Sequence, residues 1–377
     1  MSQSKQQIYQ RELASGTLTV KTTSDVCLDT LFDIAERRNP RRAFLFVSKV
    51  LGRHIPVSPT VMNKSYVNLA AGMPANLPEP VLFIGMAETA VGLAAGVFRE
   101  ASKCIAQSVF LTSTRHPVDG DLLCEFKEDH SHATDHLIYH PEDTTLRERA
   151  KNARTLVLID DEATTGKTFL NLLQALRDAG LDTLARVVTV TLTDWSGDAI
   201  SQNCPLPVDV VSLVKGSWSW TPCPDAPVPV MPSVNVTARG SASLAKRQDW
   251  GRLGMHETSC NLGDALRTEK GERILVIGSG EFVWQPFLLA ERLENDGAEV
   301  RFGSLTRSPI AIGMAIKSVI AFTDNYGLGI PNFIYNIAHH TYDRVIVCVE
   351  TPVDTVCPEL LAQLRKISPR VEVISYE

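Results

Sequence analysis

Short apolar runs alternate along the chain with segments in which apolar residues recur at helical spacing. Strand-like runs fall at residues 81–84, 109–111, 156–159, 187–192 and 208–214. The first and third are unbroken (Val-Leu-Phe-Ile and Leu-Val-Leu-Ile), as expected of strands buried on both faces of a sheet. Between the strands, residues 88–101 and 169–179 show helical spacing, and Gly180 suits a helix C-cap. This alternation predicts a parallel α/β sheet with right-handed crossovers.

A proline-rich stretch interrupts this pattern. Five prolines fall between Trp220 and Pro232, so we expect neither a helix nor a central strand to continue through it. A second α/β pattern follows, with strands at 274–277, 300–305, 345–349 and 371–375 and helices ending near 294 and spanning 359–366. We therefore predict a first domain over 1–235, a linker over 236–259 and a smaller Rossmann-like α/β domain over 260–377.

Composition narrows the class of protein. The chain has 377 residues, 44% of them hydrophobic, which is enough for two folded domains. Its 37 Lys and Arg against 43 Asp and Glu give a net charge of −6, which argues against general nucleic-acid binding but allows a local basic pocket. No apolar run approaches the ~20 residues of a membrane-spanning helix, the chain begins with polar residues, and the eight cysteines form no Cys-x-x-Cys pair. These features predict a cytoplasmic protein with reduced thiols and no membrane contact.

Residues 155–168 carry a pattern with specific chemistry: Thr-Leu-Val-Leu-Ile-Asp-Asp-Glu-Ala-Thr-Thr-Gly-Lys-Thr. A buried strand delivers two adjacent carboxylates, Asp160 and Asp161, to the C-terminal edge of the sheet, where open α/β folds bind ligands. The next loop opens a helix, whose free N–H groups and positive end suit a phosphate. Its candidate binding residues are Thr164, Thr165, Gly166, Lys167 and Thr168. Because paired acids suit sugar hydroxyls or a Mg²⁺-bound polyol, we expect a phosphorylated sugar here.

This string resembles the phosphoribosyl-pyrophosphate (PRPP) signature of type I phosphoribosyltransferases, in which an apolar strand, two acids and a Thr-Gly-x-Thr loop follow one another. The resemblance implies that Asp160 and Asp161 hold the ribose hydroxyls and stabilise positive charge at the anomeric carbon, while the loop binds the 5′-phosphate. It also implies Mg²⁺ that is held through PRPP near the two acids, with no direct protein ligand. The plainer alternative is a strand that ends in surface acids before an ordinary helix.

Two related motifs differ from this one. A Walker A loop also contains Gly-Lys-Thr, but it needs a glycine five residues before Gly166, and that position is Asp161. The hypoxanthine-guanine phosphoribosyltransferases place an Asp directly before Thr-Gly-Lys-Thr. Here that residue is Thr164, which cannot act as a carboxylate base. The identity of the acceptor base is therefore left open.

A second loop is a candidate for the donor's pyrophosphate. Residues 85–90 (Gly-Met-Ala-Glu-Thr-Ala) follow the first predicted strand and open the next helix. Their backbone N–H groups are suited to a pyrophosphate oxygen, which makes Glu88 and Thr89 candidate substrate contacts. A plain glycine turn explains the segment equally well.

Three basic residues are candidates for the same group. Arg115 lies just after the second predicted strand, where the orotate members of the family place basic residues, and its planar guanidinium matches phosphate oxygens. Lys49 and Arg53 lie in a basic segment earlier in the chain. A solvated basic turn is the alternative explanation for these two.

Histidines cluster in residues 129–136 (Asp-His-Ser-His-Ala-Thr-Asp-His), and clustered His and Asp are good metal ligands. The metallo-β-lactamase pattern, His-x-His-x-Asp-His, has one residue fewer between its second His and its Asp. Phosphoribosyltransferases carry a flexible active-site hood in the corresponding stretch between two strands. We interpret 116–136 as this hood, with His130, His132 and His136 as candidate contacts to pyrophosphate or base; a zinc hydrolase is the alternative.

The second domain offers its own candidate pocket. Gly278, Ser279 and Gly280 follow its first strand, but they supply only two of the three glycines of a dinucleotide fingerprint. Thr306, Arg307 and Ser308 follow the next strand. Together these residues predict an anion pocket at the sheet edge, with a structural turn as the alternative.

The string Thr-Arg-Ser-Pro at 306–309, taken with the first-domain signature, makes the whole chain similar to the phosphoribosyltransferases of tellurite-resistance biosynthetic clusters. Their second domain is named TRSP for this motif. The resemblance implies a type I phosphoribosyltransferase domain that transfers ribose 5-phosphate from PRPP to a nitrogenous acceptor, releases pyrophosphate and helps to make a nucleotide-like metabolite. We also expect a homodimer and partner enzymes of the same pathway. A PRPP-sensing regulator without turnover is the alternative function.

Overall fold

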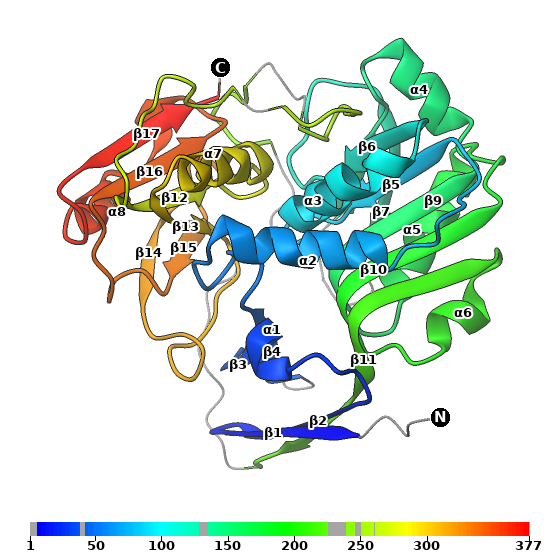
Figure 1. Ribbon diagram of the computed structural model, residues 1–377, viewed down its shortest axis with the longest axis horizontal. Coiled ribbons are helices and arrows are strands. Elements are labelled where there is room, and N and C mark those ends of the chain that lie inside the picture. Colours follow the sequence, from blue (N-terminus) through cyan, green and yellow to red (C-terminus); the bar gives the residue numbers. More distant parts are fainter. Residues whose placement is uncertain are drawn as a thin grey trace.

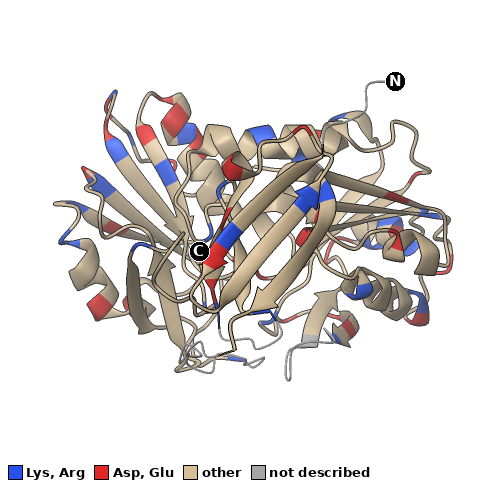
Figure 2. Ribbon diagram, turned by 90° about the horizontal axis from the view of Figure 1, so that it is seen from below, with Lys and Arg blue, Asp and Glu red and all other residues tan. Residues whose placement is uncertain are grey.

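Two sheets flank a central layer of helices in the computed structural model (Figure 1). The structure describes residues 6–37, 42–127, 135–224, 239–245, 250–259 and 261–376. The larger sheet comes from the first part of the chain and the smaller one from the second, which confirms the predicted α/β fold class. Lys and Arg are interspersed with Asp and Glu over the elements (Figure 2). In the ranges given above, no helix is long and apolar enough to cross a bilayer.

The larger sheet has seven strands, and the five predicted from apolar runs form its parallel part. In spatial order the strands are β1 (Gln7–Leu13), β2 (Gly16–Thr22), β11 (Val208–Pro222), β10 (Arg186–Asp194), β9 (Thr155–Ala163), β5 (Val81–Gly85) and β6 (Ser108–Thr112). Strand β2 runs antiparallel to both β1 and β11. The sequence pattern predicts an end of β11 near residue 214. The strand instead continues to Pro222, because its second half pairs with β2.

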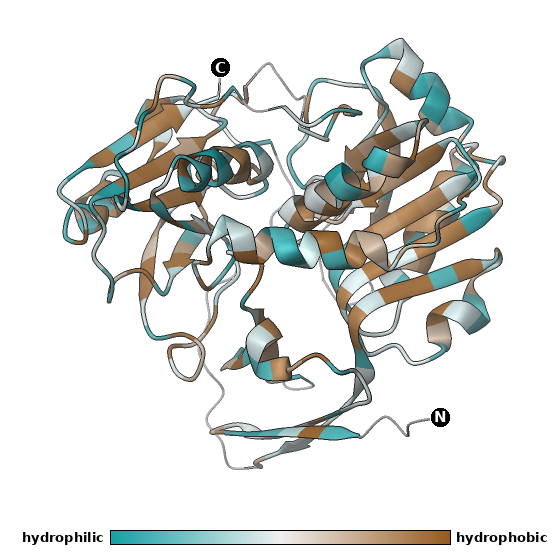
Figure 3. Ribbon diagram, viewed as in Figure 1, coloured by the Kyte–Doolittle hydropathy of each residue, from teal (hydrophilic) through white to brown (hydrophobic). Residues whose placement is uncertain are grey.

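Helices cover both faces of this sheet, so its strands are apolar on both sides (Figure 3). The helices of the first domain are α2 (Pro59–Ala71), α3 (Val91–Ala101), the 3₁₀ turn η1 (Ser102–Cys104), α4 (Thr144–Lys151), α5 (Lys167–Asp178) and α6 (Ala199–Asn203). In β9, Val157 and Ile159 belong to the apolar core that includes α2 and α3. Leu156 and Leu158 belong to the core that includes α4 and α5. This double burial fixes β9 and therefore the position of the acids at its end.

The smaller sheet has four parallel strands and lies on the other side of the central helices. Its strands in spatial order are β13 (Glu299–Ser304), β12 (Arg273–Gly278), β16 (Arg344–Val349) and β17 (Val371–Ser375). The accompanying elements are α7 (Trp284–Asn295), the hairpin of β14 (Val319–Thr323) and β15 (Pro331–Tyr335), η2 (Val353–Thr355) and α8 (Pro358–Leu364). The four predicted strands of this domain all form, within about a residue of their predicted bounds.

One apolar core crosses between the two sheets. Helix α7 packs against α2 and α3, with the ring of Phe287 at 5.5 Å from that of Tyr66. Arg99 of α3 forms an ion pair with Glu291 of α7 at 2.7 Å. The segment predicted as a linker takes part as well, because Trp250 and Arg252 within 236–259 are completely buried. The two parts of the chain are therefore held as one packed unit.

Two hairpins that the apolar pattern does not reveal complete the first domain. They are β3 (Phe32–Glu36) with β4 (Phe44–Ser48), preceded by α1 (Leu28–Leu31), and β7 (Leu122–Lys127) with β8 (Asp135–Tyr139). The second hairpin overlaps the predicted hood of 116–136 and extends beyond it to Tyr139. It packs on α5, and the carbonyl of Lys127 accepts a hydrogen bond from Asn171 of that helix at 3.3 Å.

Candidate active site

A cavity of about 380 Å³ lies where strand ends of the two sheets face one another. The C-terminal ends of β5, β6 and β9 meet at one edge because these strands are parallel. The segment after β13 reaches the same cavity from the second domain. Of the residues predicted from sequence, those that line this cavity are Arg53, Glu88, Thr89, Arg115, Asp160, Asp161, Thr306, Arg307 and Ser308. Both domains therefore contribute predicted residues to this cavity, whereas Gly278, Ser279 and Gly280 do not line it.

The acid pair stands in this cavity near the C-terminal end of β9, which continues past the acids to Ala163. The backbone N–H of Asp161 donates a hydrogen bond to Oδ1 of Asp160 at 2.9 Å. Burial raises the pKa of Asp161 to about 6, and the neighbouring charge of Glu162 acts in the same direction. The ionised carboxylate is therefore held in a place that disfavours its charge. A cation or a hydroxyl donor near Asp161 relieves this cost.

In the same cavity, basic groups from both domains gather around Glu88. Arg307 Nε lies 3.0 Å from Glu88 Oε2, and Arg53 forms an ion pair with the other carboxylate oxygen. Arg53 also donates to the carbonyl oxygen of Gly280 at 2.6 Å and to Ser304 Oγ at 3.2 Å. The predicted glycine loop of the second domain therefore supports Arg53 through its backbone.

An apolar wall of Leu45, Phe46 and Leu51 closes the cavity on the side of the β3–β4 hairpin. Phe46 stacks on Trp195 with ring centroids 5.0 Å apart. His54 lies beside this wall, and burial together with the charge of Arg53 lowers its pKa to about 3, so that the imidazole is neutral. The sequence pattern does not reveal this wall, because the β3–β4 hairpin that carries most of it shows no strong alternation of apolar and polar residues. A flat apolar group fits against such a surface.

The predicted phosphate loop follows the same strand end but lies outside the cavity lining. Gly166 adopts a left-handed conformation (φ 75°) as the N-cap of α5, and a Cβ there would come within 2.2 Å of Ile200. Thr165 and Lys167 are exposed. The hydroxyl oxygen of Thr164 accepts a hydrogen bond from Arg42 at 3.3 Å. The start of α5 therefore has exposed residues on both sides of the buried Gly166, and the backbone N–H of Lys167 donates to Thr165 Oγ1 at 3.4 Å. The first N–H groups of a helix have no partner within it and suit an anion.

Two other groups of predicted residues lie elsewhere. Lys49 does not line the cavity; its ammonium donates to the carbonyl of Asp29 at 2.9 Å. His136 is buried, with Nδ1 at 3.0 Å from the hydroxyl of Ser113. His130 and His132 lie outside the described residues. Within the part of the chain that is described, no three His, Cys, Asp or Glu side chains are grouped to hold a metal ion.

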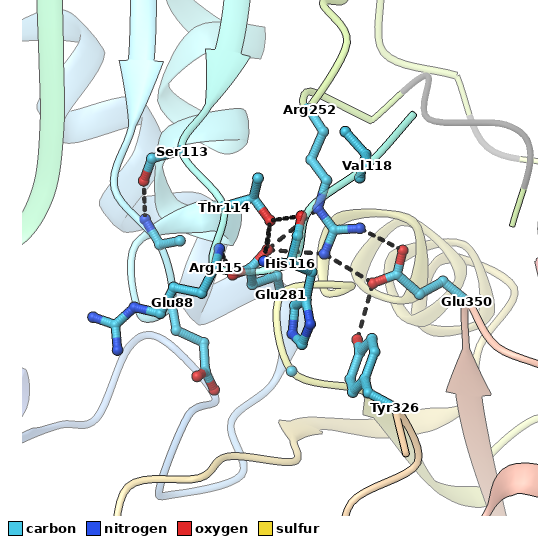
Figure 4. A network of polar contacts seen from close by, with 12 residues as sticks. Glu88, Ser113, Thr114, Arg115, His116, Val118, Arg252, Glu281, Tyr326 and Glu350 are labelled. Carbon is cyan, nitrogen blue, oxygen red and sulfur yellow. Dashed lines mark hydrogen bonds and ion pairs between the residues drawn. The ribbon is translucent and has the colours of Figure 1, made fainter. Parts of the chain in front are cut away.

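A buried polar network behind the cavity joins the domains (Figure 4). Arg252, which no sequence motif marked, pairs with Glu281 at 2.8 Å and with Glu350 at 2.7 Å. Glu281 in turn accepts hydrogen bonds from the Thr114 hydroxyl at 2.5 Å and from the backbone N–H of Arg115 at 2.7 Å. Figure 4 shows the side chain of Arg115 directed away from this network, on the side of Glu88. The network thus fixes the backbone from which Arg115 enters the cavity.

These features define a phosphoribosyltransferase-type α/β domain joined to a second α/β domain at one site. Residues 31–217 match the family model of a phosphoribosyl transferase, and residues 250–364 match that of the TRSP domain that lies C-terminal to it. The chain therefore belongs to the phosphoribosyltransferases that carry a C-terminal TRSP domain.

Solved structures with a similar fold include several adenine phosphoribosyltransferases. The enzyme of Rhodothermus marinus is 17% identical, with a TM-score of 0.32, and the match covers 49% of this chain and 94% of that one. The enzyme of Trypanosoma brucei, solved with AMP, pyrophosphate and ribose 5-phosphate, is 15% identical, with a TM-score of 0.34 and coverage of 51% and 82%. No curated protein sequence matches the chain. The family assignment thus rests on the two domain models.

Proposed function

We propose that the protein transfers ribose 5-phosphate from PRPP to a nitrogenous acceptor and releases pyrophosphate. The observation that carries this proposal is the single cavity that joins Asp160 and Asp161 to a cluster of arginines. PRPP has a sugar diol between two anionic ends, and this cavity offers acids for the diol next to cations for an anion. The exposed loop at the start of α5 supplies the second anion site.

In this proposal each part of the pocket has a defined task. Asp160 and Asp161 accept hydrogen bonds from the ribose hydroxyls and stabilise positive charge as the ring gains oxocarbenium character. Residues 164–168 bind the 5′-phosphate, and Arg115 with Glu88 and Thr89 borders the pyrophosphate. The apolar wall around Phe46 accommodates a flat acceptor.

The residues present also fit a Mg²⁺ ion that arrives with PRPP. Asp161 has a raised pKa because it is buried, and a nearby cation stabilises its ionised form. Asp160 and Asp161 would lie near the ion, while the phosphate oxygens of PRPP would supply ligands. When bound, Mg²⁺ neutralises charge on the departing pyrophosphate.

The hood and the cellular setting belong to the same proposal. We propose that the hood of 116–136, of which residues 128–134 lie outside the described residues, excludes water that would otherwise hydrolyse the donor. We propose a homodimer in the cytoplasm that works with partner enzymes to make a nucleotide-like metabolite in a tellurite-resistance cluster. The packing of the β7–β8 hairpin on α5 supports a position of the hood near the phosphate loop.

The experiment that tests this function is an assay of pyrophosphate release from PRPP and Mg²⁺ with a panel of purine, pyrimidine and other nitrogenous bases, with products identified by mass spectrometry. We expect one class of base to yield a ribonucleotide in the wild type but not in the Asp160→Asn/Asp161→Asn variant. Activity of the double variant at the wild-type rate would contradict the roles of the acids. Tight PRPP binding without turnover on any base would favour the PRPP-sensing regulator.

A further inference from the structure

Two arginines from different domains converge on one carboxylate in the cavity. Arg53 belongs to the first domain and Arg307 to the Thr-Arg-Ser-Pro segment of the second, and both contact Glu88. The side chains of Arg53, Arg307 and Glu88 are 4%, 8% and 10% exposed. The cluster is therefore buried and carries two positive charges for one negative charge.

Both arginines are held in place by contacts with the second domain. Residues 52–57 lie against β13, where Val57 pairs with Phe302, and Arg53 is anchored on the carbonyl of Gly280 at 2.6 Å. The segment of Arg307 is fixed by Tyr335, whose hydroxyl donates to the carbonyl of Ser308 at 2.7 Å. These contacts leave the guanidinium groups pre-positioned at the cavity surface.

The charge balance of the cluster favours a further anion. Burial and the charge of Arg307 lower the pKa of Arg53 to about 9. Burial also lowers the pKa of Arg307. The two desolvated guanidinium groups thus share Glu88 as an ion-pair partner, with Glu281 as a further negative charge that acts on both. An incoming phosphate oxygen offers these desolvated charges a second direct partner. The hydroxyl-bearing residues Thr306 and Ser308 line the same part of the wall.

The position of Glu88 indicates which anion this is. Glu88 lies in the loop between β5 and α3, next to the backbone of Ala87, whose N–H donates to Ser113 Oγ at 2.9 Å. Asp160 and Asp161, which we propose for the ribose, line the same cavity, and the loop proposed for the 5′-phosphate lies outside its lining. The remaining anionic group of PRPP is the pyrophosphate at the anomeric carbon.

We propose that Arg53 and Arg307 form a cross-domain clamp for the pyrophosphoryl group, with Glu88 as the internal counter-ion that this group displaces. The inference rests on the proposed function, since it assigns one end of the donor to the second domain. It makes the Thr-Arg-Ser-Pro segment a working part of the transferase site rather than a separate binding site. Once Glu88 is displaced, the two arginines are available to pair with the negative charge that the donor brings.

The test uses the full-length protein with two probes, Mg²⁺-pyrophosphate and ribose 5-phosphate, each titrated by calorimetry. We expect Arg307→Gln to weaken pyrophosphate binding by about ten- to a hundredfold, as the loss of a charge-assisted contact does, and to leave ribose 5-phosphate binding within about twofold. Arg307→Lys keeps the charge but not the planar fork, so its affinity for pyrophosphate should lie between those of the wild type and Arg307→Gln. Arg273→Gln is the matched control, because it removes an exposed, ion-paired arginine outside this cavity.

Glu88→Gln tests the counter-ion role separately. Because the amide no longer competes for the two arginines, we expect this variant to bind Mg²⁺-pyrophosphate several-fold more tightly than the wild type. Thermal unfolding of each variant confirms that the fold is retained. Unchanged or weaker pyrophosphate binding by Glu88→Gln would contradict displacement of the carboxylate.

The two probes separate this inference from the proposed function. Suppose that the wild type binds both ribose 5-phosphate and pyrophosphate, and that folded Arg307→Gln binds pyrophosphate equally well. This result overturns the clamp and leaves the transferase proposal standing. Failure of the wild type to bind either probe, or PRPP, would overturn both proposals.

Discussion

We expect Asp161 to lower the free energy of unfolding while it contributes to ligand binding. Its folded pKa of about 6 exceeds its ordinary value of 3.8 because it is buried. The folded state therefore binds more protons than the unfolded state between these values, and stability falls as pH rises from about 4 to 6. Above pH 6 the carboxylate is ionised in both states, and the folded protein carries the full cost of its burial.

We accordingly expect Asp161→Asn to stabilise the fold at pH 8 by about 1–3 kcal/mol while it weakens PRPP binding. The gain should disappear near pH 4, where the wild-type carboxyl is protonated. Urea unfolding at the two pH values measures this difference. A variant that is less stable than the wild type at pH 8 would show that the carboxylate is needed for packing.

The same ionisation should appear in ligand binding. PRPP and Mg²⁺ favour the charged carboxylate, so their affinity should rise by about tenfold for each unit as pH increases toward 6 and level off above it. Titrations between pH 5 and 8 in one buffer system follow this change. Affinity that is independent of pH across this range would argue that Asp161 is not at the ligand.

At the scale of elements, helix α5 offers a matched pair of glycines. Gly166 at its start has φ 75° and packs against Ile200, whereas Gly180 beyond its end has φ 94°, and a Cβ added there would meet no atom within 4 Å. At both positions the positive φ disfavours any residue with a side chain. Only at Gly166 would an added Cβ also clash with its surroundings.

We expect Gly180→Ala to cost about 1 kcal/mol of unfolding free energy and Gly166→Ala about 2–4 kcal/mol. Only Gly166→Ala should also weaken ribose 5-phosphate binding, because the loop must shift to relieve the clash. Chemical denaturation and calorimetry compare the two variants. Equal effects of the two substitutions on ligand binding would show that the shape of the loop is not important.

The parallel strands could be predicted from the sequence because burial on both faces produces unbroken apolar runs. The acid pair and its loop could be predicted because they are contiguous in the chain. Helix α2 was missed although Met62, Tyr66 and Leu69 recur at helical spacing after Pro59. The β3–β4 hairpin and the second half of β11 depend on partners distant in the sequence, so no local pattern reveals them.

At the scale of the whole molecule, the sequence suggested a separate pocket in each domain, whereas the structure brings residues of both predicted pockets to one cavity. Arg53 and Arg307 are far apart in the chain, and their convergence follows only from the packing of β13 against residues 52–57. The importance of Arg252 was also hidden, because a single arginine in a polar segment gives no sign that it is buried between two glutamates.

This buried network joins the domains alongside the shared apolar core. Burial alone would raise the pKa of Glu281, but Arg252 and the other groups around it outweigh burial and lower the pKa to about 2. Glu281 therefore contributes stability above its ordinary pKa of 4.5, and this contribution is lost as pH falls toward 2.

We expect Glu281→Gln to destabilise the protein by about 3–5 kcal/mol at pH 7, since it removes one partner of a buried ion pair. The difference from the wild type should narrow in acid. Urea unfolding, followed by the fluorescence of the tryptophans, measures this loss. A change in unfolding free energy below about 0.5 kcal/mol would show that the network contributes no more than a weak surface ion pair does.

The decisive experiment for the proposed donor site is a calorimetric titration of the full-length protein with PRPP in the presence of Mg²⁺, repeated with Asp160→Asn/Asp161→Asn. We expect saturable binding by the wild type at one site per chain and at least tenfold weaker binding by the double variant, with both proteins folded. Absence of PRPP binding by the folded wild type, or equal binding by the two proteins, would contradict this assignment.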